Sequence, residues 1–229
     1  MARDEKKQLC AICGKEEATT SDHIPPRGIF PKPRPSNLIT VPACFYCNHA
    51  GSKYDESFRV YLSMEVGADT PETRKLWEEN ALGTLQHNQR LRRNIERSFR
   101  FIDVRTPAGI YLGKATAFRI DAKIYNAVIE RIVRGFYYHH YAEILGDRAT
   151  CKATMLRGID RKVLEMSRGW PINVLGKQAL IYKFNRASES PLHSVWIFEF
   201  YNHHWAMCST QPVSVPNNSL KPTPKSDAA

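Results

Sequence analysis

Residues 10–58 read CAICGKEEATTSDHIPPRGIFPKPRPSNLITVPACFYCNHAGSKYDESF. This stretch carries two Cys-x-x-Cys pairs, Cys10 with Cys13 and Cys44 with Cys47, and 30 residues separate the pairs. Tetrahedral zinc takes four ligands, and two such turns supply them when the intervening segment folds back. The stretch therefore predicts a four-thiolate zinc site. Because protein ligands fill all four positions, we expect this zinc to be structural.

Three polar side chains in the same stretch are not needed to bind zinc. Asp22 and His23 lie between the cysteine pairs, and Asn48 directly follows the last cysteine. Hydrolysis of a phosphodiester needs a base that deprotonates water and a divalent cation that stabilises charge on oxygen. Histidine titrates near neutrality, and carboxylate and amide oxygens suit Mg²⁺ or Mn²⁺. The alternative is a turn aspartate that caps a loop beside a buried histidine.

The order of these residues resembles a known motif. DHIP at residues 22–25, NL at residues 37–38 and the CxxCN segment that ends at Asn48 resemble the HNH endonuclease motif of the ββα-metal nucleases, in its zinc-stabilised, treble-clef-like form. The resemblance covers residues 10–63. It implies that His23 is the general base, that Asp22 and Asn48 bind the catalytic metal, and that Asn37 ties the loop together and helps to orient the base. It also assigns the four cysteines to structural zinc.

The loop after His23 departs from the family pattern because it is proline-rich where many members have a glycine pair. Six prolines lie between residues 25 and 42, which makes the connection stiff and extended. His49 beside Asn48 leaves two side chains that could face the metal. Basic side chains in the loop and the following helix could contact phosphates or be solvated surface charge. They are Arg27, Lys32, Arg34 and Lys53.

The composition favours a polyanionic partner. The formal charge is +10, from 33 Lys and Arg against 23 Asp and Glu. Such an excess biases a protein towards nucleic acid, although it also fits a merely basic surface. The N-terminus is charged where a signal peptide would be apolar, and no apolar run is long enough for a membrane helix. We expect a cytoplasmic protein with no membrane partner, in which paired cysteines bind metal rather than form disulfides.

The rest of the chain predicts an α+β protein with antiparallel strands. A small zinc-bound ββα domain is expected at residues 10–65, a linker helix at 66–82, an α+β domain of unknown role at 83–210 and a disordered tail at 211–229. Helical spacing is expected at residues 45–64, at 70–98 with an interruption near Gly83, and at 121–145. Strands are expected as a hairpin at 99–105 and 110–120, and at 179–185, 194–201 and 204–209.

Three further features also have a purely structural interpretation, which we favour for the first two. Cys151 and Cys208 stand alone and read as small buried hydrophobes. The aromatic and histidine cluster at residues 137–141 could bind metal or bases, but consecutive helical residues point in different directions, which favours packing. The five arginines of residues 90–100 could lie along a phosphate backbone or be a solvated helix face.

Together these patterns predict an HNH-type endonuclease that hydrolyses phosphodiester bonds, with DNA as the favoured substrate. Structural zinc and catalytic Mg²⁺ or Mn²⁺ are the expected metals. The first alternative is a zinc-organised nucleic-acid-binding module without catalysis, which would need none of the three polar residues. A second alternative is a protein-interaction scaffold, which the basic charge disfavours.

Overall fold

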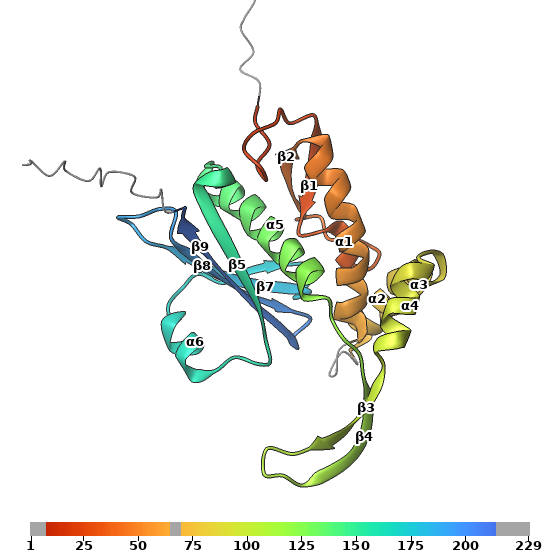
Figure 1. The fold of residues 1–229 in the computed structure, drawn as a ribbon. Helices are drawn as coiled ribbons and strands as arrows, with labels where there is room; N and C mark the ends of the chain where they lie inside the picture. The colour runs from red at the N-terminus through yellow and green to blue at the C-terminus, as the bar shows by residue number, and fades with distance from the viewer. Residues whose placement is uncertain (1–7, 65–69, 214–229) are drawn as a thin grey trace, which may run out of the picture.

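A computed structural model describes residues 8–64 and 70–213 (Figure 1). It has mixed helices and antiparallel sheets, so the α+β class is confirmed. Residues 1–7, 65–69 and 214–229 lie outside the described residues, and with them the start of the predicted linker helix at 66–82 and most of the predicted tail at 211–229. Among the described helices, none is long and apolar enough to cross a membrane.

The N-terminal part is a β-hairpin followed by a long helix. Strands β1 (Thr20–Ile24) and β2 (Ile39–Ala43) pair antiparallel, with Asp22 opposite Val41 and His23 opposite Thr40. Helix α1 (Phe45–Met64) has the limits that its apolar spacing predicts. The proline-rich loop between the strands contains one 3-10 turn, η1 (Arg27–Ile29).

A run of short helices follows. They are α2 (Pro71–Leu76), the wider π-helical turn η2 (Trp77–Ala81), α3 (Leu82–His87) and α4 (Gln89–Ser98). Thr70 caps the first of them and Thr73 completes a capping box. The interruption predicted near Gly83 corresponds to the π-helical turn that ends at Ala81, and a second break, which was not predicted, lies at Asn88, whose side chain caps α4.

A β-hairpin and a long helix come next in the chain. Strands β3 (Arg100–Arg105) and β4 (Tyr111–Ala117) form the predicted hairpin, which projects from the body (Figure 1). Helix α5 (Ala122–Tyr141) begins at the predicted cap, Asp121. It ends four residues before the predicted residue 145, because Ala142 has a left-handed backbone with φ of 53°.

The C-terminal part is a five-stranded antiparallel sheet in the order β5-β9-β8-β7-β6. Its strands are β5 (Ala149–Leu156), β6 (Asn173–Leu175), β7 (Leu180–Arg186), β8 (Ser194–Phe200) and β9 (His204–Pro212). The strands β5 and β6, the turn η3 (Gly146–Arg148) and the helix α6 (Arg161–Met166) were not predicted. Strand β9 includes two residues of the predicted tail, 211 and 212.

Helix α5 is the centre of the core. One of its sides covers the sheet, and the other meets α1 and the β1–β2 hairpin (Figure 1). Its buried stripe includes Val128, Ile132 and Phe136. Gly135 allows close approach, because a Cβ there would overlap the side chain of Ile24. The larger hydrophobic cluster contains residues from both sides of residue 65, where the sequence predicts the end of the small zinc domain. This domain boundary stays a prediction.

The histidine cluster on α5 illustrates the packing. The ring of His140 lies 4.3 Å from that of Phe184 and 6.1 Å from that of Trp196, measured between centroids. Its Nε2 atom is 2.9 Å from the Tyr182 hydroxyl. Burial, and secondarily the charge of His139, lowers the pKa of His140 to about 4. This histidine is therefore part of the aromatic packing between α5 and the sheet.

We expect His140 to weaken the fold in acid. The unfolded chain protonates this side chain near pH 6.5, whereas the folded chain resists protonation until about pH 4. Between these values the unfolded state binds more protons, so stability falls as the pH decreases. The His140→Gln variant keeps a hydrogen-bonding partner for Tyr182 but does not titrate. Urea unfolding should show a smaller loss of stability between neutral and acidic pH for this variant; an equal loss would contradict the assignment.

Candidate functional site

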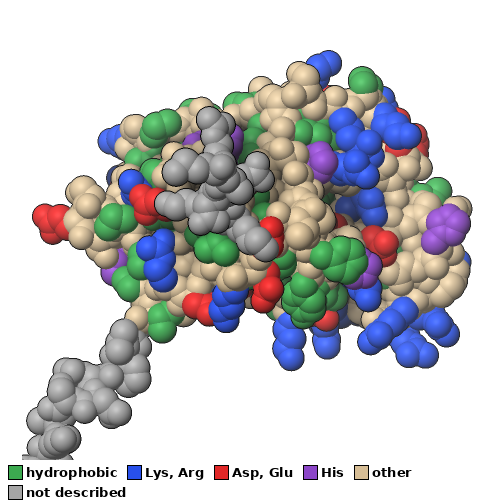
Figure 2. Space-filling view, turned by 90° about the horizontal axis from the view of Figure 1, so that it is seen from above, with side chains coloured by type: hydrophobic (Ala, Val, Ile, Leu, Met, Phe, Trp, Pro, Cys, Tyr) green, Lys and Arg blue, Asp and Glu red, His purple; other side chains and the backbone are tan. Residues whose placement is uncertain are grey.

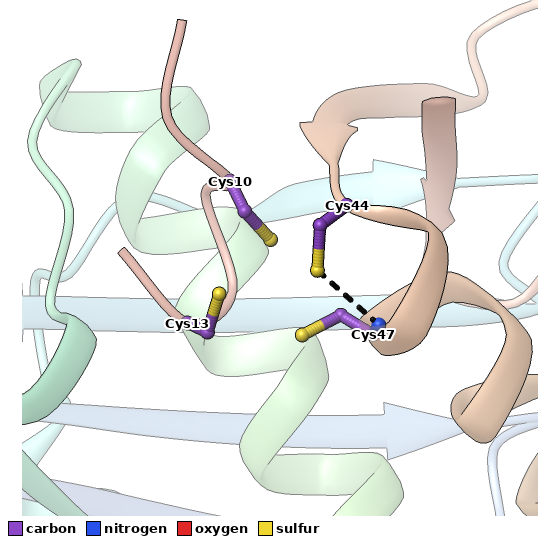
Figure 3. Close-up of side chains that lie close together, drawn as sticks. All are labelled: Cys10, Cys13, Cys44 and Cys47. Atoms are coloured by element: carbon purple, nitrogen blue, oxygen red, sulfur yellow. Dashed lines mark hydrogen bonds between the residues drawn. The ribbon is translucent and has the colours of Figure 1, made fainter. Parts of the chain in front are cut away.

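The four predicted cysteines converge. The sulfur atoms of Cys10, Cys13, Cys44 and Cys47 all lie within 4.8 Å of one another and point towards a common centre (Figure 3). Tetrahedral zinc with sulfur at about 2.3 Å separates its ligand atoms by about 3.8 Å, which is compatible with this cluster. The cluster could hold a structural metal ion such as zinc.

Backbone contacts fix the two cysteine turns beside each other. Gly14, with φ of 69°, donates from its N–H to the Cys10 carbonyl at 2.8 Å and closes the first turn. The N–H of Ala11 bonds the Pro42 carbonyl at 2.8 Å, which attaches this turn to the end of β2. Burial opposes ionisation of Cys13, but backbone hydrogen bonds from Glu16 and Lys15 outweigh it and lower the pKa of this thiol to about 7.

The second pair sits where β2 passes into α1. The N–H of Cys47 points at the Cys44 sulfur at 3.4 Å (Figure 3). Because Asn48 is the next residue, the cysteine cluster lies directly beside the first turn of α1. Its Nδ2 atom donates to Thr20 Oγ1 at 3.1 Å and to the Ser21 carbonyl at 3.2 Å, so the Asn48 side chain faces β1. His49 is exposed and stacks on Phe45, with ring centroids 5.4 Å apart.

Asp22 lies in a buried charge cluster. Its side chain is 7% exposed, and its Oδ2 atom is 3.6 Å from Nη1 of Arg131 on α5. Arg131 also forms an ion pair with Asp55 of α1. One guanidinium thus faces two carboxylates. Burial raises the pKa of Asp22 to about 6, although the charge of Arg131 works in the opposite direction. Within the described chain, Asp22 Oδ2 is buried and accepts no hydrogen bond.

Sequence reasoning missed Asp55, Arg131 and Gly51. A Cβ on Gly51 would overlap the Arg131 guanidinium, so this glycine makes room for it against α1. Asp55 follows Asn48 by seven residues, which is two helical turns on one face, and this spacing could have identified it. Arg131 follows Ile124 by seven residues and interrupts the apolar stripe of α5, which signals a buried partner.

The side chains of His23 and Asp22 lie on opposite faces of β1, because successive side chains of a strand alternate between its two faces. The His23 side chain is half-buried. Burial and the positive charges of Arg27 and Arg34 lower its pKa. Arg59 of α1 packs closely against Gly28 of the same loop. A Cβ on Gly28 would lie only 2.7 Å from the Arg59 Nη1 atom. Burial and the two nearby arginines therefore favour the neutral form of His23.

The proline-rich loop is held by contacts from distant segments. Asn80 donates to the Gly28 carbonyl at 3.1 Å, Glu79 accepts from the Lys32 N–H at 2.8 Å, and the Tyr201 hydroxyl bonds the Ile29 carbonyl. The Asn37 amide donates to the Val174 carbonyl of β6 at 3.2 Å. Asn37 thus ties the loop to the C-terminal sheet, and the described contacts do not join it to His23.

A groove of about 530 Å³ continues from this loop. Its wall contains one acidic and four basic side chains. The basic ones are Lys32, Arg34, Lys75 and Lys177. Lys53 lies exposed on α1 and outside the groove lining. Two of the four candidate phosphate contacts, Lys32 and Arg34, therefore border a common basic groove, and one of them, Arg34, also acts on the charge of His23.

No protein-family model, curated protein or solved structure matches this chain.

Proposed function

We propose that the protein is an HNH-type endonuclease that hydrolyses phosphodiester bonds in nucleic acid, with DNA as the expected substrate. The observation that carries the proposal is the setting of His23. A half-exposed neutral imidazole lies near two loop arginines, one residue from a buried carboxylate that has an oxygen without a hydrogen-bond partner in the described chain. A base, cationic groups and an acidic ligand are the parts that this reaction requires.

Two oxygen donors fit a hard divalent ion. Asp22 offers the buried Oδ2, and the charge cluster around it holds two carboxylates against one guanidinium. Asn48 uses its Nδ2 to bond β1, which leaves its Oδ1 for a ligand. Carboxylate and amide oxygens with water suit Mg²⁺ or Mn²⁺. When bound, such an ion would stabilise negative charge on the phosphate oxygens.

The chain's own residues would act around that ion as follows. His23 would take a proton from the attacking water at a ring nitrogen, because its lowered pKa keeps the ring neutral at physiological pH. Arg27 and Arg34, which influence the same ring, would attract and orient the phosphodiester. The basic groove lined by Lys75 and Lys177 would carry the adjoining backbone.

The four-cysteine cluster would supply the scaffold for this site in the form of a ββα zinc unit. A four-thiolate zinc site leaves no open position for substrate, so its role would be structural. It would fix Asn48 through the neighbouring Cys47 and would hold the Cys10 turn against β2.

One observation favours the second candidate, a nucleic-acid-binding module without catalysis. The Asp22 carboxylate is 7% exposed and faces Arg131, as a purely structural ion-pair partner would. In that case the arginines and the groove would bind phosphates, and Asp22 would only link α5 to β1.

Cleavage distinguishes the two candidates. Purified protein is incubated with supercoiled plasmid, linear duplex DNA or single-stranded RNA, with Mg²⁺, with Mn²⁺ or without added divalent ion. Metal-dependent nicking is expected for the nuclease. Binding of the same substrates without cleavage under any of these conditions would instead select the binding module.

A further inference from the structure

The β3–β4 hairpin stands apart from the rest of the molecule. In the described part of the chain its two strands pair only with each other, and they extend away from the body below α4 (Figure 1). None of their residues is buried. We call β3, β4 and the turn between them, residues 100–117, the arm. An isolated two-stranded ribbon gains little stability from its own contacts, so its side chains are available to a partner.

The arm and the preceding helix hold much of the protein's positive charge. From Gln89 to Ala117 there are seven Lys or Arg and two Asp or Glu, a net charge of +5, and the net charge of the whole chain is +10. Arg90, Arg93 and Arg97 of α4 are exposed and share one face by their spacing. Seen from the cysteine end, Lys and Arg side chains gather on the side that carries α3 and α4 (Figure 2).

The tip of the arm is ordered by its own bonds. The turn closes through hydrogen bonds between Thr106 and Ile110 and between Gly109 and Thr106, both at 2.8 Å. Arg105 donates to the Gly109 carbonyl at 3.2 Å, and its guanidinium lies 5.5 Å from the Tyr111 ring centroid. The tip therefore presents cationic and aromatic groups in a fixed arrangement.

Large apolar side chains accompany these charges. Phe101 is 78% exposed, Ile110 is 65% exposed and Leu112 is 64% exposed. Such exposure on a projecting ribbon marks a contact surface. Apolar groups on DNA-binding elements contact thymine methyl groups or insert between base steps, so they are compatible with a nucleic-acid partner.

We propose that the arm and α4 bind double-stranded nucleic acid, with the ribbon in a groove and the arginines of α4 along the phosphate backbone. A two-stranded antiparallel ribbon fits the major groove, which is about 12 Å wide. Phosphate contacts from the helix would set the register of the ribbon. This inference rests on the proposed function and extends it. It names double-stranded nucleic acid as the substrate class, and it places a second substrate-binding surface away from His23.

A second copy of the chain is the weaker candidate for this surface. A two-fold dimer through the arm would bring the same basic surface of both chains together. Seven basic side chains against two acidic ones on each chain would repel their counterparts, whereas a duplex neutralises them. Charge complementarity therefore favours the duplex.

The test measures binding apart from cleavage. Full-length protein in the His23→Ala background, without added Mg²⁺, is titrated against a labelled duplex of about 30 base pairs, three helical turns. The arm variant is Arg105→Gln with Lys114→Gln. The matched control is Lys162→Gln with Arg168→Gln, two exposed residues at and after α6, which removes the same charge. Fluorescence anisotropy is recorded between about 50 and 200 mM salt.

We expect the arm variant to bind about tenfold more weakly than the control, with a salt slope smaller by about 1.8, because each lost phosphate contact removes about 0.9. Equal affinity for both variants, or no duplex binding by the parent chain, would overturn the inference. The inference would also be overturned if Phe101→Ser converted a dimer to a monomer in sedimentation experiments without changing the affinity for the duplex. The arm would then be a dimer interface. If the wild-type protein bound the duplex through the arm but did not cleave it, this inference would be supported and the nuclease proposal would be refuted.

Discussion

A Cys47→Ser variant is expected to lose its metal and much of its structure. Structural zinc binding is worth about 10–16 kcal/mol in small zinc-binding peptides, and this free energy is coupled to folding. Here the Cys44–Cys47 turn opens α1, and the Cys10 turn is bonded to the end of β2. Loss of one thiolate would release both. We expect a loss of at least about 4 kcal/mol of stability, which lowers the melting temperature by about 10 °C or more.

The matched control is Cys151→Ser, which lies on β5 outside the cluster and should keep its metal. Metal content is measured by elemental analysis, and folding by circular dichroism. A Cys47→Ser protein that is fully folded and free of metal would refute the structural role of the cluster.

The second large effect is expected at Arg131. An Arg131→Met variant would leave Asp22 and Asp55 buried without a positive charge, and breaking a buried ion pair in this way costs about 3–5 kcal/mol. The control Arg157→Met changes an exposed arginine and should shift stability by no more than about 0.5 kcal/mol. Urea unfolding gives both values.

A double variant separates charge from packing at this position. Adding Asp22→Asn to Arg131→Met removes one of the two unpaired carboxylates, so it should restore part of the lost stability. If instead the two losses simply add, the 3.6 Å contact between these side chains contributes nothing, and the coupling of α5 to β1 through charge is wrong.

Much of the N-terminal fold could be predicted because its signals are local. The Cys-x-x-Cys spacing identified a cluster that the structure brings within 4.8 Å, and apolar spacing set both ends of α1. The hairpin at residues 99–120 also followed from β-prone runs around a turn. These features depend on residues that are close together in the sequence, and a local sequence pattern can detect such features.

The parts that could not be predicted depend on distant contacts or weak patterns. The pairing of Asp22 with Arg131 joins segments more than a hundred residues apart, so periodicity could only flag the arginine as unusual. Strand β6 has three residues, too few to show alternation. Strand β5 alternates exposed polar side chains with inward-facing ones that are small, so its apolar pattern is weak in the sequence and its pairing with β9 is hidden.

The site shows the same division. That Asn48 faces β1 follows from its place in the first turns of α1, whereas the contact of Asn37 with Val174 could not be foreseen. The resemblance assigned Asn37 to the loop near the base. The structure instead attaches it to a sheet strand formed far along the chain.

In the proposed mechanism, His23 performs the chemistry on a scaffold that the cysteines hold. The most direct measurement is plasmid nicking by wild type and by His23→Ala in the same Mg²⁺ or Mn²⁺ buffer, after both proteins are shown to have equal metal content and melting temperature. Loss of a general base lowers rates by about 10²–10⁴-fold, so we expect nicking by the variant to fall at least a hundredfold. Equal nicking by the two proteins would contradict the claim.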